Sequence, residues 1–317
     1  MEITIGKRRA YFCNVKALLI FLVVYGHLIE TRIEECDMLM WQYRIIYAVH
    51  MPLFAFLSGV FLKGKRECLA QGKKALCYYL IFQIICMFGM KMIQGTAVSV
   101  LEPFWHLWYL LSLSTWAFIC LGLELVEKHL QGFWKKAILI IASVIIACVI
   151  GNVEGVDRTL SLSRTIAFLP YVLMGKYLPM DESVKNYKVW GILAGISSVI
   201  WILYQAPNIP IAFWYQADSY AACGVENGML LRLISYVAGI GLGLCILVLI
   251  PQKKTYISKI GINTLWIYIL HAPLVLVLRE MVLWKEAYKY MVFFMAASIV
   301  IFIYKGFQWH AKLYRIE

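Results

Sequence analysis

The chain alternates long apolar runs with short polar connections along its whole length. A helix that crosses a bilayer needs roughly 20 mostly apolar residues, and it satisfies its backbone hydrogen bonds without water. Windows of about this length fall at ten places: 12–29, 41–62, 74–94, 104–122, 136–151, 164–178, 188–204, 228–250, 260–278 and 288–306. The pattern predicts an all-α, polytopic integral membrane helix bundle with about ten transmembrane helices.

Composition points to the same class of protein. Of the 317 residues, 62% are hydrophobic and 15% are charged, and the mean hydropathy is +0.74. These values exclude a water-soluble globule of ordinary composition. We expect a single membrane-embedded domain over residues 1–317, with no soluble extracytoplasmic domain and no cleavable signal peptide. Any activity then belongs to the helices and their short loops.

The distribution of charge predicts the orientation. If the segments alternate across the membrane, most of the 30 Lys and Arg residues fall on the side of the N-terminus, whereas Glu30, Glu34 and Asp157 fall on the other side. Because basic loops stay cytoplasmic, we expect both termini in the cytoplasm and a multi-pass protein of a cell membrane, such as the bacterial cytoplasmic membrane. The net charge of +12 is scattered over short loops, which favours membrane lipids over nucleic acid as its partner.

Ionisable residues inside the apolar segments are the candidates for function, because such a side chain at membrane depth costs a few kcal/mol or more. Lys16 and His27 lie about 20° apart around the first helix and about 16 Å apart along it. Cys13 and Glu30 share that face. The first segment therefore has the features of one wall of a polar channel, with Lys16 near the cytoplasmic mouth and His27 well across the bilayer.

His50 and His271 lie at depths comparable to that of His27 when residues are counted from the helix ends, so the imidazoles of His27 and His50 can meet. An imidazole can take a proton from a hydroxyl near neutral pH, and a basic side chain at the cytoplasmic mouth can hold phosphates. Other interpretations stay open. Lys16 can extend to the interface, Arg44 can anchor headgroups, and His27 can be a packing residue.

Four blocks of sequence carry a resemblance to a known family. They are YFCNVKALLIFLVVYGH, VHMPLFAFLSGVF, FWHLWYLLSL and IGINTLWIYILHAPL, in this order and over most of the chain. Together they resemble the acyltransferase 3 family, in particular its branch similar to fucose 4-O-acetylases. The resemblance implies a membrane O-acyltransferase that moves an acetyl group from cytoplasmic acetyl-CoA to a hydroxyl of a carbohydrate or cell-envelope acceptor.

The resemblance extends to individual positions. The residues that match the family's motifs are Lys16, His27, His50, His106, Trp108, Tyr268 and His271. The family commonly has an aspartate three residues before the basic position of the first helix, and this chain has Cys13 there. Loss of that carboxylate leaves room for an altered function.

The expected roles follow from the resemblance and the helix geometry together. His27 acts as general base or carries the acetyl group, and Glu30 orients it or contacts the incoming sugar. His50, or a nearby hydroxyl or amide, helps to stabilise the oxyanion. Lys16 binds acetyl-CoA, the acyl donor, and no metal is expected, because no cysteines form a CxxC pair. The substrate-binding or supporting residues are Arg44, Trp108, Tyr268 and His271.

Two other functions remain on the sequence alone. One is a transporter of a small polar solute, such as an amino acid, built on the same fold. The other is a non-catalytic pseudoenzyme, which the change at Cys13 keeps open. Many relatives carry a fused extracytoplasmic domain. This sequence has none, so we expect that the acceptor comes to the membrane domain or that a partner protein takes the acetyl group, and homo-oligomerisation stays open.

Overall fold

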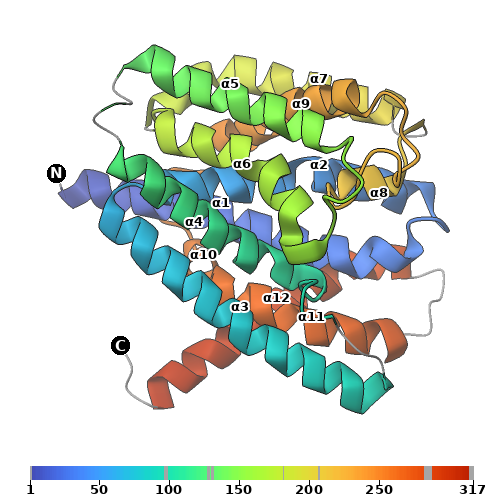
Figure 1. The fold of residues 1–317 in the computed structure, drawn as a ribbon. Coiled ribbons are helices and arrows are strands. Elements are labelled where there is room, and N and C mark those ends of the chain that lie inside the picture. The colour runs from blue at the N-terminus through green and yellow to red at the C-terminus, as the bar shows by residue number, and fades with distance from the viewer. Residues whose placement is uncertain are drawn as a thin grey trace. The chain divides into compact units, whose positions relative to one another are not determined.

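The computed structural model describes residues 2–95, 99–126, 129, 132–180, 182–205, 208–281 and 288–313. This part of the chain is helical and contains no strand. The long helices in Figure 1 are α1 (Glu2–Ile29), α2 (Asp37–Phe61), α3 (Lys65–Gln94), α4 (Trp108–Leu125), α5 (Phe133–Ile150), α6 (Leu162–Tyr177), α7 (Lys188–Gln205), α9 (Gly228–Leu249), α11 (Thr264–Met281) and α12 (Tyr288–Leu313). The short ones are η1 (Glu30–Arg32), η2 (Trp105–Leu107), η4 (Thr159–Ser161), η5 (Glu182–Tyr187), α8 (Ile211–Trp214) and α10 (Ser258–Ile262).

Each predicted apolar segment coincides with helix, so the all-α prediction is confirmed for the described residues. The segment 260–278 is divided between α10 and α11, with Asn263 at the junction. Eight of the described helices are long and apolar enough to cross a bilayer, and the apolar helix Thr264–Arg279 is shorter. The count of ten stays a prediction.

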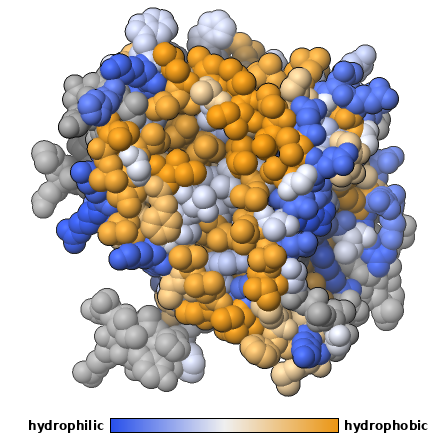
Figure 2. All heavy atoms as spheres, viewed as in Figure 1, coloured by the Kyte–Doolittle hydropathy of each residue, from blue (hydrophilic) through white to orange (hydrophobic). Residues whose placement is uncertain are grey.

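Hydrophobic side chains cover the outer surfaces of several helices. In α3 only 17% of the most apolar window is buried, compared with 72% in α1. Figure 2 shows one face of the molecule, on which hydrophobic side chains predominate. The exposed apolar residues of α3 include Leu80, Ile81, Ile84, Ile85 and Phe88. Such a surface is stable against lipid and unstable in water, as expected for a multi-pass membrane protein.

Glycines set both ends of α3. Gly64 precedes the helix with φ +90°, and Gly95 follows it in the left-handed conformation, where its N–H donates to the Lys91 carbonyl. A residue with a Cβ rarely adopts these angles, which is why glycine ends many helices.

The chain separates into two compact units. Unit 1 comprises Met1–His50, Asp181–Leu203 and Gly241–Glu317, and unit 2 comprises Met51–Met180 and Tyr204–Ile240. The helices α2, α7 and α9 contribute residues to both units. The expectation of one domain over 1–317 stays a prediction.

In unit 1, α1 packs against α10, α11 and α12, which come from the other end of the chain (Figure 1). Gly261 of α10 lies so close to Cys13 that a Cβ on the glycine would overlap the Cys13 carbonyl. The buried Asn14 Nδ2 donates to the carbonyls of Pro251 (2.8 Å) and Lys253 (3.0 Å). Its Oδ1 accepts hydrogen bonds from the hydroxyls of Thr255 (2.7 Å) and Ser258 (2.6 Å). One amide therefore uses its full hydrogen-bonding capacity to hold segment 251–258 on α1.

In unit 2, α3 packs against α4, and α5 packs against α6. The C-terminal part of α2 crosses α6 at Gly59 and Gly175, where a Cβ on either glycine would overlap a carbonyl of the opposite helix. The buried Lys176 of α6 donates to the Leu62 carbonyl (3.0 Å) and forms an ion pair with Glu124 of α4. These contacts fix the positions of three helices within this unit.

Candidate functional site

The central candidate site lies where α1 ends. His27 is in the last turn of α1, and Glu30 begins η1, which continues the chain in helical geometry. His27 Nδ1 lies 3.5 Å from Glu30 Oε2, and both side chains are largely buried, with 13% and 21% exposed. The spacing of three residues places the two groups on one face of the helix. An imidazole and a carboxylate are thus adjacent in a mostly water-excluded position.

Two further side chains hold Glu30. Arg279, near the end of α11, places its Nη2 2.7 Å from Glu30 Oε2, and the same atom donates a hydrogen bond to the backbone carbonyl of His27. The Tyr43 hydroxyl donates to Glu30 Oε1 over 3.3 Å. The carboxylate is therefore fixed from α1, α2 and α11 together, and it compensates the charge of Arg279.

Sequence reasoning did not identify Arg279. The apolar window 260–278 ends one residue before it, so Arg279 falls in the connection that the alternation places on the side opposite the N-terminus. A signal was present: Arg279 follows His271 by eight residues on one helix, about 80° around the axis, so the two positions share one side of it.

The imidazole of His271 stacks on that of His27, with ring centroids 5.4 Å apart and planes 20° apart. His271 is fully buried, and its Nδ1 lies 3.1 Å from the Ile267 carbonyl. Because a carbonyl only accepts hydrogen bonds, Nδ1 carries the proton, and Nε2 is the accepting nitrogen of the neutral ring. The Tyr268 ring is tilted against His271 at 5.9 Å. His271 therefore lies beside His27, and Tyr268 lies against His271.

His50 is connected to the same region along α2. Its Nδ1 donates to the Ile46 carbonyl at 2.6 Å, and its ring meets Tyr47 edge to face at 4.8 Å. Tyr47 in turn packs on Tyr43 at 4.1 Å, and Tyr43 contacts Glu30. A continuous row of side chains thus joins His50 to the carboxylate that faces His27.

Lys16 is partly exposed on α1, two residues after Asn14. Asn14 holds the backbone of Lys253, so a second basic residue is fixed near the start of the apolar part of α1.

Lys185 has a structural role, because its Nζ donates to the carbonyls of Val248 (2.6 Å) and Ile250 (2.5 Å) at the end of α9. Asn14 was also missed from sequence, although it is an amide within an apolar run.

The remaining predicted residues are in different surroundings. Arg44 is buried in α2, with its guanidinium carbon 6.0 Å from the Trp41 ring centroid. Trp108 belongs to unit 2, where it stacks on Phe168 at 5.5 Å and contacts the Arg164 guanidinium at 5.0 Å. The Trp108 ring is therefore already engaged by two neighbours within its own unit.

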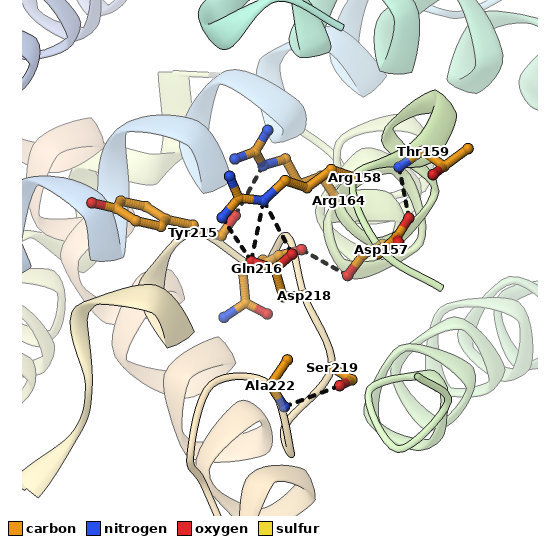
Figure 3. Close-up of polar contacts among 10 residues, drawn as sticks. Asp157, Arg158, Thr159, Arg164, Tyr215, Gln216, Asp218, Ser219 and Ala222 are labelled. Carbon is orange, nitrogen blue, oxygen red and sulfur yellow. Dashed lines mark hydrogen bonds and ion pairs between the residues drawn. The ribbon is translucent and has the colours of Figure 1, made fainter. Parts of the chain in front are cut away.

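A second charged cluster joins loops of unit 2 (Figure 3). Arg158 forms a two-pronged ion pair with Asp218, with Nη2 2.9 Å from Oδ2 and Nε 3.1 Å from Oδ1. Arg164 Nε donates to the Tyr215 carbonyl at 3.2 Å. The pairing with Asp218 raises the pKa of Arg158, and the hydrogen bond from the Thr159 amide lowers the pKa of Asp157. These contacts attach the 215–218 segment to the start of α6.

Backbone strain accompanies the loop cluster. Leu160, Ser161 and Gln216 have φ values of 49°, 56° and 55°, in the left-handed region that side chains disfavour.

Across the part of the chain that the structure describes, no group of three or more His, Cys, Asp or Glu residues is arranged to hold a metal ion.

Comparison with known proteins gives one match. A family model described as an acyltransferase domain matches residues 9–307, which is nearly the whole chain. No curated protein and no solved structure matches. The family match confirms the resemblance of the four sequence blocks and does not specify a branch. Together with its apolar helices, it shows that this multi-pass membrane protein is an acyltransferase and belongs to the acyltransferase 3 family.

Proposed function

We propose that this acyltransferase moves an acetyl group from acetyl-CoA to a hydroxyl of a carbohydrate or another cell-envelope acceptor. The observation that carries the proposal is the His27–Glu30 pair, in which the carboxylate is fixed by Arg279 and Tyr43. An imidazole supported by a held carboxylate is the arrangement that general-base catalysis of acyl transfer requires.

The chemistry follows from the two ring nitrogens of His27. His27 Nδ1 and Glu30 Oε2 are 3.5 Å apart, and we expect Nδ1 to donate a hydrogen bond to this carboxylate when substrates bind and the site tightens. Nε2 then takes the proton of the acceptor hydroxyl while that oxygen attacks the thioester carbonyl carbon. The carbon–sulfur bond breaks, and the proton passes from Nε2 to the CoA thiolate. In the covalent variant, Nε2 attacks the thioester carbonyl carbon, the carbon–sulfur bond breaks, and CoA leaves as the thiolate. The acceptor oxygen then attacks the acetyl carbon, the carbon–Nε2 bond breaks, and the hydroxyl proton passes by way of the released Nε2 to the CoA thiolate.

His50 is proposed to stabilise the oxyanion, and its hydrogen bond to Ile46 sets a condition for that role. Because Nδ1 already donates to the carbonyl, His50 can donate to an oxyanion only through Nε2–H. This requires the imidazolium form of His50, which burial disfavours in the absence of substrate and which the negative charge of the oxyanion itself would have to stabilise. The electrostatic stabilisation of the tetrahedral intermediate is then greater than from a neutral donor.

The donor is proposed to enter at the Lys16 end of α1. Lys16 and the neighbouring Lys253 segment supply positive charge for the phosphates of acetyl-CoA. The arm of acetyl-CoA that carries the thioester then extends along α1 and spans the distance of about 16 Å between Lys16 and His27. Cys13 is buried beneath Gly261, so no carboxylate competes with the phosphates at that position.

The proposed setting is a cell membrane, such as the bacterial cytoplasmic membrane, crossed by about ten helices of one domain with both termini in the cytoplasm. Basic residues on the N-terminal side support this orientation. The acceptor approaches from the other side, alone or with a partner protein. The Glu30 end of α1 then faces the acceptor, and the Lys16 end faces the donor.

The test is incubation of the detergent-purified protein with radiolabelled acetyl-CoA, with release of free CoA and retention of label as readouts. We expect His27→Ala to lower CoA release by about 10²-fold or more. Lys16→Ala should chiefly raise the KM for acetyl-CoA. His129→Ala is the control for the first variant, because His129 is an exposed histidine of unit 2. CoA release by His27→Ala at the unmodified rate would contradict the proposal.

A further inference from the structure

Arg44 is a buried guanidinium without a counter-charge in the described part of the chain. Only 7% of the residue is exposed. No carboxylate or carbonyl among the described residues accepts a hydrogen bond from it, and its Nε is fully buried with no hydrogen-bond partner. Its described contact is the Trp41 ring, 6.0 Å from the guanidinium carbon, which is at the outer limit of a cation–π interaction.

Among the described residues the other buried cations have a carboxylate or carbonyl partner, although the Nε of Arg232 is, like that of Arg44, buried without a hydrogen-bond partner. Arg279 pairs with Glu30, and Lys176 pairs with Glu124. Arg232 donates to the Ala147 carbonyl in the last turn of α5, where the helix dipole favours a positive charge. Arg44 has no equivalent contact among the described residues, so these structural roles do not account for it.

The lack of compensation is costly for an arginine. An arginine does not lose its proton under ordinary conditions, so it cannot escape burial by becoming neutral as a lysine can. An unpaired buried charge costs several kcal/mol, and an ionisable residue inside a membrane segment marks a substrate or ion pathway by default. No described residue supplies the partner, and the chemistry that would compensate Arg44 is that of an anion.

The position of Arg44 relates that anion to the reaction. The preceding residue, Tyr43, contacts Glu30, and Tyr47, one turn later, contacts both Tyr43 and His50. Arg44 lies in the same turn of α2, about 100° around the axis from Tyr43 and about 60° from Tyr47, so it is within one turn of the residues that border the proposed site of transfer. Its planar guanidinium matches phosphate and carboxylate groups, with which it forms paired hydrogen bonds.

We propose that Arg44 binds an anionic group on the acceptor, so that the preferred acceptor is a sugar bearing a phosphate or a carboxylate. The identification of the bound molecule as the acceptor rests on the proposed function. A lipid headgroup phosphate offers the same chemistry, and the experiment below separates the two sources.

The test measures binding to the full-length, detergent-purified protein by isothermal titration, with glucose 1-phosphate, glucuronate and methyl glucoside as probes. We expect the unmodified protein to bind one of the charged sugars more tightly than the neutral one. Arg44→Gln should weaken that binding by about 10- to 100-fold, and Arg44→Lys by less. Arg32→Gln is the matched control, because Arg32 is paired with Glu35 at 2.5 Å. Thermal unfolding without ligand verifies that the variants fold.

Three results would overturn the proposal. The first is equal binding of charged and neutral sugars to the unmodified protein, and the second is unchanged binding of the charged sugar to Arg44→Gln. The third is Arg44-dependent stabilisation by phosphatidylglycerol nanodiscs, relative to phosphatidylcholine nanodiscs, that the charged sugars do not compete for. The last result assigns Arg44 to a lipid headgroup. Release of CoA is measured separately, so failure of the acetyltransferase proposal is distinguished from failure of anion binding.

Discussion

The Glu30 cluster of unit 1 and the Arg158 cluster of unit 2 contain the same kind of ion pair in opposite surroundings. Glu30 and Arg279 are 21% and 14% exposed and meet at a histidine. Arg158 is 52% exposed, and its pair with Asp218 joins two loops. Water screens the second pair and is largely excluded from the first. Exposure therefore separates a charge pair that can act on a neighbouring imidazole from one that organises the surface.

Of the variants that test this comparison, Arg279→Ala should have the largest effect on stability and activity. Arg279→Ala leaves Glu30 buried without its cation, which we expect to cost about 3–5 kcal/mol in the free energy of unfolding. CoA release should fall as well, because Arg279 also holds the carbonyl of His27. Detergent-micelle unfolding and CoA release measure the two effects. A variant as stable as the unmodified protein would contradict the buried character of this pair.

Glu30→Gln removes the negative charge of the Glu30 cluster and keeps the size of the side chain, so it tests whether that charge contributes to catalysis. Glu30→Gln retains hydrogen-bonding capacity but no longer stabilises an imidazolium at His27, so kcat should fall by about 10²-fold. The KM for acetyl-CoA should hardly change, since Lys16 is far from Glu30 along α1. A lower kcat with an unchanged pH profile would indicate a purely structural role for the carboxylate.

Breaking the loop pair should have the smallest effect. Arg158→Ala is expected to cost no more than about 1 kcal/mol in the free energy of unfolding, because the arginine is half exposed. CoA release should match that of the unmodified protein. Comparison with Arg279→Ala under the same conditions gives the difference between the two clusters directly, and a loss of CoA release in Arg158→Ala would show that the loops contribute to catalysis.

The helices were predictable because a helix that crosses a bilayer is apolar along most of its length, and hydropathy measures this for each residue. The shared face of Lys16, His27 and Glu30 was predictable from helical periodicity. The partners of these residues were not, because Arg279 is 249 positions from Glu30 in the sequence. Counting residues gives the depth of His50 and His271, but it does not say which ring stacks on His27. That ring is His271, and the choice depends on which helices pack against α1.

The hydrogen bonds of Asn14 have a consequence for biogenesis. Asn14 is synthesised early, and its partner Pro251 lies 237 residues later. At about 5–20 residues per second, the ribosome needs roughly 10–50 s to reach that partner. During this interval the Asn14 amide has none of its four native partners. Glu30, at the other end of the polar face of α1, is likewise without Arg279. The first helix must therefore remain in the membrane or its insertion machinery with its polar groups satisfied elsewhere until the last third of the chain arrives.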